Sequence, residues 1–420
     1  MANIKCDYLI IGGGILGVAC AISLAKKTNY LKKIVLVEKK VICAGLSSRH
    51  SGLIRAANSS SLAAQMASEA ISMWKNLEKY WGINSSYQKT GAVWIGAKPK
   101  NHGDRDPWQE ISNHMRTLKI DFEEIDQHTV QKLTKNVIHT DAFERYFYEP
   151  EAIQLNVSAL TESVSNAIML TNVAVYESTE ITQINTCDAN ISHLVTNKGT
   201  FEPAKVINAA GAWSSEIFKS CGLNIPVKLE PVYIGKWLVG NSKLCDQSPI
   251  VADYVNKAYF RGMPGSIIHM HQPRERNTTK ISMNFLEEDK HLLPDNIYEN
   301  AHLNLAQSTV NDYAEKIKNR FPKIETPVFA GGYTSFFDIT PDLNFILGID
   351  DQVNNLIHCL GAGQALKYAP IFGEIIADIA ICGLSTQYNI DEFSIKRFNK
   401  SSLDDYFASK TVNKNAPASL

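Results

Sequence analysis

The chain has few of the features that mark a disulfide-stapled or zinc-bound protein. Its 420 residues contain eight cysteines, and no two of them form a C-x-x-C pair. Scattered thiols of this kind are typical of a protein kept in a reducing, intracellular compartment. His269 and His271 alternate in sequence, but no carboxylate stands at ligand spacing with them, so we predict no metal site.

The sequence also lacks a strong charge of either sign. Its 42 Lys and Arg residues nearly balance 43 Asp and Glu residues, and the net charge of −1 argues against nucleic acid or an anionic membrane as the main partner. The apolar run over residues 9–25 contains three consecutive glycines, which predicts a strand and a helix rather than a transmembrane segment. With no secretory signal ahead of it, we expect a cytoplasmic protein, and peripheral membrane association stays open.

What the chain does contain is a glycine-rich turn near its start. The apolar residues 8–11 lead into Gly12-x-Gly14-x-x-Gly17, and a helical pattern follows. This order of buried strand, tight turn and helix is the fingerprint of a dinucleotide site. Gly12 makes the turn, Gly14 lets the backbone approach a pyrophosphate, and Gly17 lets the helix pack on the strand. The helix N-terminus then offers free N–H groups to the phosphates.

A second predicted strand ends in an acid at the expected distance. Residues 33–37 lead to Glu38, which follows Gly14 by 24 residues. An acid about 20 residues after the glycines accepts hydrogen bonds from the ribose hydroxyls in such sites. A plain glycine turn followed by a solvated Glu is the alternative, and the order of all these features disfavours it.

Two later segments repeat the pattern of a strand that opens onto glycine. Residues 201–207 are predicted to form a strand that enters residues 209–211, and residues 356–360 a strand that enters residues 361–363. Glycine at such points allows a close approach of the backbone to a ligand or a neighbouring segment. The small, polar and basic residues 41–55 predict a loop that could lie along a cofactor, with a plain surface loop as the alternative.

Apolar spacing predicts the main helices. They are expected over residues 61–80, 157–169, 313–321 and 371–381. The length of the chain predicts two domains.

With these motifs in this order, the sequence resembles the FAD-dependent oxidoreductase family of D-amino-acid oxidase, glycine oxidase and sarcosine oxidase. The likeness is nearest to the branch of sarcosine oxidase and dimethylglycine dehydrogenase. The motifs that carry it are the glycine turn with Glu38, residues 47–55, residues 208–213, Thr340-Pro341-Asp342 with Gly348, and Gly361-x-Gly363 with Lys367. They are specific for the family and not for the substrate.

The resemblance implies an α/β (α+β) fold, with a Rossmann-like FAD-binding domain and a discontinuous substrate domain built on an antiparallel sheet. The FAD-binding domain would comprise residues 1–85, 150–225 and 331–400, and the substrate domain residues 86–149 and 226–330. We expect residues 411–420 to be a disordered tail.

The resemblance also implies the residues that bind FAD. They are Gly12, Gly14, Ile15, Leu16, Gly17, Glu38, Lys39, Ser47, Ser48, Arg49, His50, Val173, Ala210, Gly211, Trp213, Gly361, Gly363, Gln364 and Lys367. Some relatives attach FAD covalently through a His in the loop after the acid or through a Cys before the Thr-Pro-Asp motif. The matching positions here are Arg49 and Ser335, so we predict non-covalent FAD.

Substrate-binding residues follow from the same resemblance. Arg55 and Lys367 match basic positions that hold a substrate carboxylate in sarcosine oxidase relatives, a task that suits a bidentate Arg and a second cation. Arg261 is a third candidate anchor, and Tyr259 and His269 are candidates for shaping the pocket. The lysine that promotes reaction with oxygen in many relatives has its match near residues 268–269, which favours a dehydrogenase. The electron acceptor, oxygen or a quinone or electron-transfer protein, stays open.

The implied enzyme oxidises the C–N bond of an amino acid or N-methylated amine by hydride transfer to flavin N5, and the imine then hydrolyses. One alternative is a FAD-dependent dehydrogenase or oxidase of a 2-hydroxy acid or glycerol phosphate. That chemistry needs a base, for which His269 or His271 could serve. The other alternative is a flavoprotein without turnover, acting as a subunit or assembly factor.

Overall fold

The apolar strand near the start of the chain becomes the centre of a parallel sheet. The computed structural model describes residues 3–99, 106–240, 248–263, 267–271, 305–324 and 326–398. In it β1 (Asn3–Ile11) lies between β2 (Ile34–Val37) and β12 (Gly199–Asn208) and pairs in parallel with both. β9 (Ala174–Tyr176) pairs with β2, and β19 (Leu356–Leu360) pairs with β12, also in parallel. The last four residues of β1 and all of β2 are buried, which explains why both segments are continuous apolar runs.

Antiparallel strands complete this first sheet. The hairpin of β10 (Ile181–Cys187) and β11 (Asn190–Thr196) pairs with the start of β12, and β18 (Ile346–Ile349) pairs with β19. On one face α1 (Ile15–Lys27) packs against α10 (Ala365–Cys382). Their contact is close, because a Cβ on Gly373 would lie 2.6 Å from the carbonyl oxygen of Ala19. Strand β11 was not among the predicted elements.

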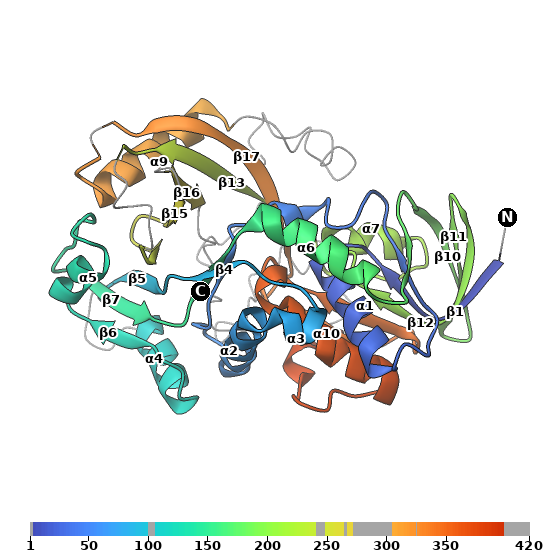
Figure 1. The fold of residues 1–420 in the computed structure, drawn as a ribbon. Helices are drawn as coiled ribbons and strands as arrows, with labels where there is room; N and C mark the ends of the chain where they lie inside the picture. The colour runs from blue at the N-terminus through green and yellow to red at the C-terminus, as the bar shows by residue number, and fades with distance from the viewer. Residues whose placement is uncertain are drawn as a thin grey trace.

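The second sheet is antiparallel apart from one parallel pair, β14 with β5. Its strands, in spatial order, are β17 (Val328–Ile339), β13 (Lys228–Leu238), β16 (Ile267–His271), β15 (Ala258–Met263), β14 (Ile250–Asp253), β5 (Ala92–Ala97), β7 (Glu144–Glu149) and β6 (Glu123–Ile125). A small third sheet has the order β3 (Leu53–Ile54), β8 (Ile153–Leu155), β4 (Tyr87–Lys89). Figure 1 shows the first and second sheets in two lobes that lie side by side.

The remaining helices cover the two sheets. They are α2 (Ser61–Lys75), α3 (Leu77–Trp81), α4 (Pro107–Thr117), α5 (Gln127–Leu133), α6 (Val157–Met169), α7 (Ser214–Lys219), α9 (Gln307–Arg320), and the short 3₁₀ turns Leu46–Ser48, Gly211–Trp213, Asp391–Phe393 and Ile395–Arg397. In Figure 1, α4, α5 and α9 lie in the lobe of the second sheet, and α6 lies beside α1.

Sequence periodicity located most helices and misjudged some of their ends. Helix α6 has the predicted bounds, whereas the helix predicted over residues 61–80 breaks at Asn76 into α2 and α3. The helix predicted to begin at residue 371 begins at Ala365 and contains Pro370. Proline here removes one N–H bond in the second turn, which a long buried helix tolerates.

We propose that the domain boundaries expected from the resemblance hold, with β17 as an exception. Residues 331–339 were expected in the FAD-binding domain, yet they form most of β17 in the second sheet. The expected tail, residues 411–420, lies outside the described residues.

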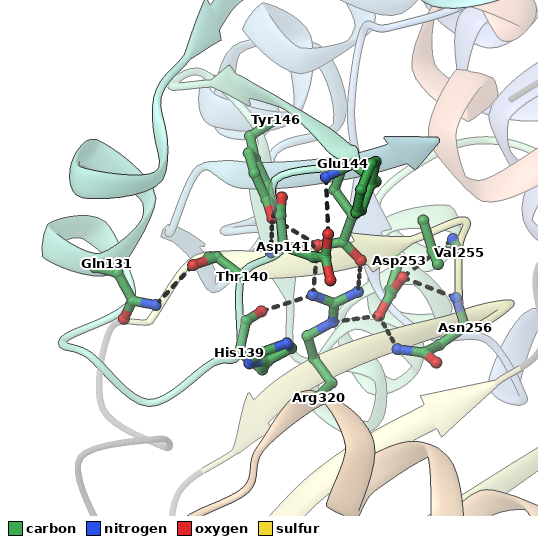
Figure 2. A network of polar contacts seen from close by, with 11 residues as sticks. Gln131, His139, Thr140, Asp141, Glu144, Tyr146, Asp253, Val255, Asn256 and Arg320 are labelled. Carbon is green, nitrogen blue, oxygen red and sulfur yellow. Dashed lines mark hydrogen bonds and ion pairs between the residues drawn. The ribbon is translucent and has the colours of Figure 1, made fainter. Parts of the chain in front are cut away.

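A buried arginine ties α9 to the second sheet (Figure 2). The Arg320 guanidinium pairs with Asp253 and with Glu144, each at 2.6 Å, and donates to the carbonyl oxygen of His139. All three ionic side chains are at most 9% exposed. Burial alone would raise the pKa of Glu144, but the bonds from Arg320 and Tyr146 hold it below its ordinary value.

We expect the Arg320→Met variant to lose about 3–5 kcal/mol of the free energy of unfolding, because two buried carboxylates lose their counter-ion. Urea unfolding at pH 7 measures the loss. A carboxyl with a lowered pKa stabilises the fold above its unfolded pKa and loses this contribution as the pH falls. The difference between the variant and the parent chain should therefore shrink below about pH 4.

The matched control is Lys5→Ala, which removes an ion pair to Glu202 whose lysine side chain is 84% exposed. Exposed pairs contribute less than about 1 kcal/mol, so this variant should unfold almost as the parent does. Equal stability of the Arg320→Met variant and the parent would contradict a role for Arg320 in fastening α9.

Candidate functional site

The glycine turn after β1 is packed against the chain on two sides and open on the third. Gly12 has a φ of 100°, and a Cβ there would lie 2.6 Å from the carbonyl oxygen of Ala209. A Cβ on Gly17 would lie 1.9 Å from the carbonyl oxygen of Gly12. A Cβ on Gly14 would have the Ser47 hydroxyl oxygen as its nearest neighbour, at 3.2 Å. The start of α1 is therefore accessible beside Gly14.

Ser47 and Glu38 complete this end of the site. The Ile15 N–H donates to Ser47 Oγ at 2.8 Å, which brings the loop after β2 to the first turn of α1. Glu38, at the end of β2, accepts from the N–H of Gly13 at 2.7 Å and from that of Lys40 at 2.8 Å. Burial raises the pKa of Glu38 although these two N–H groups oppose the rise.

A cavity that is partly open to solvent lies between this loop, strands β13 and β17, and the start of α10. The expected site residues that line it are Ile15, Ser47, Arg49, His50, Arg55, Tyr259, Gly363, Gln364 and Lys367. The cavity therefore gathers residues from distant parts of the sequence.

Three buried polar atoms of this lining have no hydrogen-bond partner among the described residues: His50 Nε2, Gln364 Oε1 and Lys367 Nζ. Burial, with the charge of Arg261, lowers the pKa of His50 to about 3, so its ring is neutral. Since His50 Nδ1 accepts from the N–H of Gly52 at 3.0 Å, Nε2 carries the hydrogen. Buried polar groups are normally paired, so these atoms indicate a polar ligand in the cavity.

Two buried cations reach the cavity from different elements. The Arg55 guanidinium lies 4.7 Å from the ring centre of Trp94 and donates to the carbonyl oxygen of Ala57. Lys367, in the first turn of α10, has its Nζ 4.6 Å from the ring centre of Tyr368. Burial, and then the charge of Arg55, hold the pKa of Lys367 well below its ordinary value. An anion bound between the two would relieve this cost.

Two tyrosines form one wall of the cavity. The hydroxyl of Tyr259 is hydrogen-bonded to that of Tyr254, whose ring stacks on Trp94 at 6.1 Å between centres. Tyr254 was missed by the sequence analysis, because nothing in its neighbourhood separates it from an ordinary core tyrosine.

The first turn of α10 is shaped by glycine. A Cβ on Gly361 would lie 2.6 Å from the Cα of Ala365. Gly363 has a φ of 75°, lies against Phe337, and donates its N–H to Asp338 Oδ1 at 2.7 Å. These contacts fix Gln364 and the start of the helix against β17.

Arg261 and His269 differ from the other substrate candidates. Arg261 does not line the cavity, and it donates to the carbonyl oxygens of Ser51 and, at 3.1 Å, Leu155. It therefore fastens the loop behind the cavity. The backbone of His269 lies in β16 opposite Arg261, and its side chain lies outside the described residues.

The remaining expected cofactor residues lie outside the cavity lining. Leu16 is buried in the first turn of α1, and Ser48 donates to the carbonyl oxygen of Gly45 at 3.2 Å. Lys39 pairs with Glu180 at the surface. Val173 directly precedes β9, and Ala210, Gly211 and Trp213 follow β12, with open space beside Gly211.

Comparison with known proteins identifies the family. The sequence matches the DAO family, described as FAD dependent oxidoreductase, over residues 7–379. The chain belongs to this family. FAD is the cofactor of the family, and the open side of Gly14, the acid at the end of β2 and the three polar atoms of the cavity fit it.

Curated members of the family differ in their descriptions. This chain is 24% identical to the pyruvate dehydrogenase phosphatase regulatory subunit of Mus musculus over 94% of its own length and 43% of the relative. It is 19% identical to the dimethylglycine dehydrogenase of Rattus norvegicus, covering 97% of the chain and 46% of the relative. Monomeric sarcosine oxidase of Arthrobacter sp. is 22% identical, covering 94% and 97%. The chain thus spans less than half of the first curated relatives it matches.

Solved structures share the fold. L-proline dehydrogenase from P. horikoshii has a TM-score of 0.79 at 17% identity, covering 94% of this chain and 97% of the other. Glycine oxidase from Geobacillus kaustophilus has a TM-score of 0.73 at 18% identity, covering 94% and 100%. The predicted fold class is thus confirmed. Within the described residues, no helix has the length and apolar character needed to cross a membrane.

We expect Gly14→Ala to fold normally and to bind FAD at least 10-fold more weakly. Gly14 has a φ of −70°, which alanine adopts without strain, and its surroundings are open except for the Ser47 hydroxyl. The added methyl group would occupy the space that the fingerprint reserves for the pyrophosphate. FAD titration of the apoprotein, with thermal unfolding of the same sample, measures both properties.

Gly17→Ala is the comparison variant, because its methyl group would clash with Gly12 inside the protein itself. This variant should lose stability with or without FAD. An unchanged FAD affinity in the Gly14→Ala variant would contradict the assignment of the turn.

We expect Lys367→Met to unfold at higher urea concentration than the parent apoprotein at pH 7. The ammonium of Lys367 has no hydrogen-bond partner in the described chain, and such a buried group costs about 1–3 kcal/mol. Because the folded chain disfavours the charged form, the gain should grow as the pH falls.

Lys26→Met serves as the control, since Lys26 donates to the carbonyl oxygens of Lys79 and Tyr80. Its removal should leave stability unchanged or lower it. A Lys367→Met apoprotein less stable than the parent would show that the ammonium is satisfied in the fold.

Proposed function

We propose that the chain is an FAD-dependent enzyme that oxidises the C–N bond of an amino acid or N-methylated amine. The observation that carries the proposal is the convergence of Arg55 and Lys367 on one cavity at the start of α10. A carboxylate is the ligand that a planar guanidinium and a second cation suit. Relatives and structural neighbours described as dimethylglycine dehydrogenase, sarcosine oxidase, glycine oxidase and L-proline dehydrogenase support the reaction class.

Each part of the site has a role in this proposal. Gly12, Gly14 and Ser47 would hold the pyrophosphate, and Glu38 would bind the ribose. When bound, FAD supplies the two-electron oxidation itself. Arg49, in the loop after β2, and Ser335, in β17, offer neither the His nor the Cys that carries a covalent link in relatives, which supports non-covalent binding.

The chain's own residues orient the substrate and select its protonation state. With its carboxylate held by Arg55 and Lys367, the substrate would be anchored at one end, and Tyr254 and Tyr259 would limit its movement at the side. The same two cations disfavour a protonated amine beside them. The amine would therefore bind neutral, its lone pair would be available for imine formation, and no side-chain base would be needed. Water then hydrolyses the released imine.

A second function has one observation in its favour. The match to the regulatory subunit of Mus musculus covers 94% of the length of this chain. The family therefore also includes a protein that is described by a regulatory role. In that case the chain would bind FAD without turnover. The 2-hydroxy-acid alternative needs a base. His50 lines the cavity, but its Nε2 carries a hydrogen and is a donor, so this atom does not supply that base.

The test is to mix the purified holoprotein without air with N-methyl amino acids, D-amino acids, L-proline analogues and 2-hydroxy acids. We expect at least one amine to bleach the flavin absorbance near 450 nm, since a reduced flavin loses that band. Arg55→Met should bind FAD as the parent does and bleach at least 100-fold more slowly at low substrate concentration, because a charged bond to substrate is lost.

Bleaching by 2-hydroxy acids alone would replace the amine reaction with the alternative chemistry. A flavin that no compound reduces, in a protein that dithionite still reduces, would favour the regulatory role. Readmitting air after bleaching separates an oxidase from a dehydrogenase.

A further inference from the structure

A fully buried carboxylate lies behind the two cations. Glu149, the last residue of β7, is 0% exposed and does not line the cavity. Its two oxygens accept from the N–H groups of Ala56 and Ala57, the latter at 3.3 Å. Since these residues directly follow Arg55, Glu149 fastens the backbone that carries the first cation.

Glu149 also acts on both cations through its charge. Burial lowers the pKa of Arg55, and Tyr259, Tyr254 and then Glu149 outweigh it and raise that pKa. Glu149 also opposes the lowering of the pKa of Lys367 that burial and Arg55 produce. The other ionic residues of the lining, Arg49 and Asp338, contribute one charge of each sign. Arg55, Lys367 and Glu149 therefore decide the net charge around a bound carboxylate.

The hydrogen bonds of Glu149 are those of an ionised group. In every hydrogen bond that the described residues make with it, Glu149 accepts. Burial raises its pKa, and the N–H of Ala56, the charge of Arg55, the N–H of Ala57 and the charge of Lys367 oppose the rise in that order. A protonated carboxyl would need an acceptor, whereas both oxygens face N–H donors.

We propose that Glu149 sets the net charge of the carboxylate pocket at +1 and thereby selects monocarboxylate substrates with a neutral amine over dicarboxylates. This inference rests on the proposed role of Arg55 and Lys367. A bound carboxylate favours the charged form of Lys367, which the empty pocket disfavours, and with Lys367 charged it brings the pocket to neutrality. A second carboxylate, or a protonated amine, would leave a charge uncompensated where little water can screen it.

The effect of replacing Glu149 follows from the same sum of the charges of Arg55, Lys367 and Glu149. Without its charge the pocket has a net charge of +2 and matches a dianion. The change acts through Arg55 and Lys367, so Glu149 is a positioning residue that does not touch the substrate. Loss of structure alone would weaken the binding of all ligands together, whereas loss of the charge changes the order of their affinities.

The experiment uses the holoprotein at pH 8 and constant ionic strength, with butanoate and succinate as ligands of equal chain length. Binding is followed by the change in the flavin absorbance spectrum. We expect the parent to bind butanoate at least 10-fold more tightly than succinate, and Glu149→Gln to reduce this preference at least 10-fold. Glu149→Asp, which keeps the charge, should retain the preference.

The matched control is Glu151→Gln. Glu151 lies two residues away and pairs with Lys75 and Lys89 at the surface, so its removal should leave the preference unchanged. Equal ratios for the parent and the Glu149→Gln variant would overturn the proposal, as would a parent that binds succinate as tightly as butanoate.

A further variant tests the count if Glu149→Gln does not fold. Lys367→Met removes one cation, so the pocket becomes neutral if Glu149 is ionised and keeps a charge of +1 if it is not. We expect this variant to bind butanoate no more tightly than butanamide. A retained preference for butanoate would overturn the proposal.

The outcome is separable from that of the proposed function. A protein whose flavin no amine reduces, but whose ligand preference follows the three charges, would lose the proposed reaction and keep this inference. Rapid bleaching by an amine, with equal affinities for butanoate and succinate, would support the proposed reaction and overturn the inference on Glu149.

Discussion

The structure depends on how closely the turn after β1 approaches the end of β12. A Cβ on Gly12 would lie 2.6 Å from the carbonyl oxygen of Ala209, and one on Gly17 would lie 1.9 Å from Gly12 itself. These contacts bring the carboxyl ends of the parallel strands and the start of α1 to one edge of the sheet. Ligands bind at this edge in open α/β sheets, because helix N-termini and strand ends meet there.

The second half of the site depends on one link between the sheets. Gly363, at the turn before α10, donates its N–H to Asp338 in β17, while α10 packs through Gly373 on α1. Helix α10 is therefore fixed to both sheets, and its first turn presents Lys367 to the cavity. Arg55 arrives from the loop after β3. The cavity thus exists because elements far apart in the sequence are fastened to the same helix.

The parts of the site that the sequence predicted are those whose chemistry is local. Gly12, Gly14 and Glu38 follow a spacing that the strand and turn impose, and β19 has the predicted bounds for the same reason. Glu149 and the true start of α10 depend on tertiary contacts instead. The pair Glu149-Pro150 after a strand resembles an ordinary turn. Pro370 argues against a helix in the sequence, so the five helical residues before it were not predicted. The fold class and the two cations were predictable from the sequence, whereas the buried negative charge of Glu149 was not.

The charges of Lys367 and Glu149 favour an enzyme that binds an anionic substrate over a protein that binds FAD without turnover. A buried lysine whose ammonium has no hydrogen-bond partner among the described residues costs free energy in every folded molecule. The bond from Trp74 to Lys367 goes to its backbone oxygen, so the ammonium takes no part in it. A protein that used FAD as structural support would be more stable with an apolar residue there. Under the proposed function, an anion in the cavity accounts for Lys367, and a single charge on that anion accounts for Glu149.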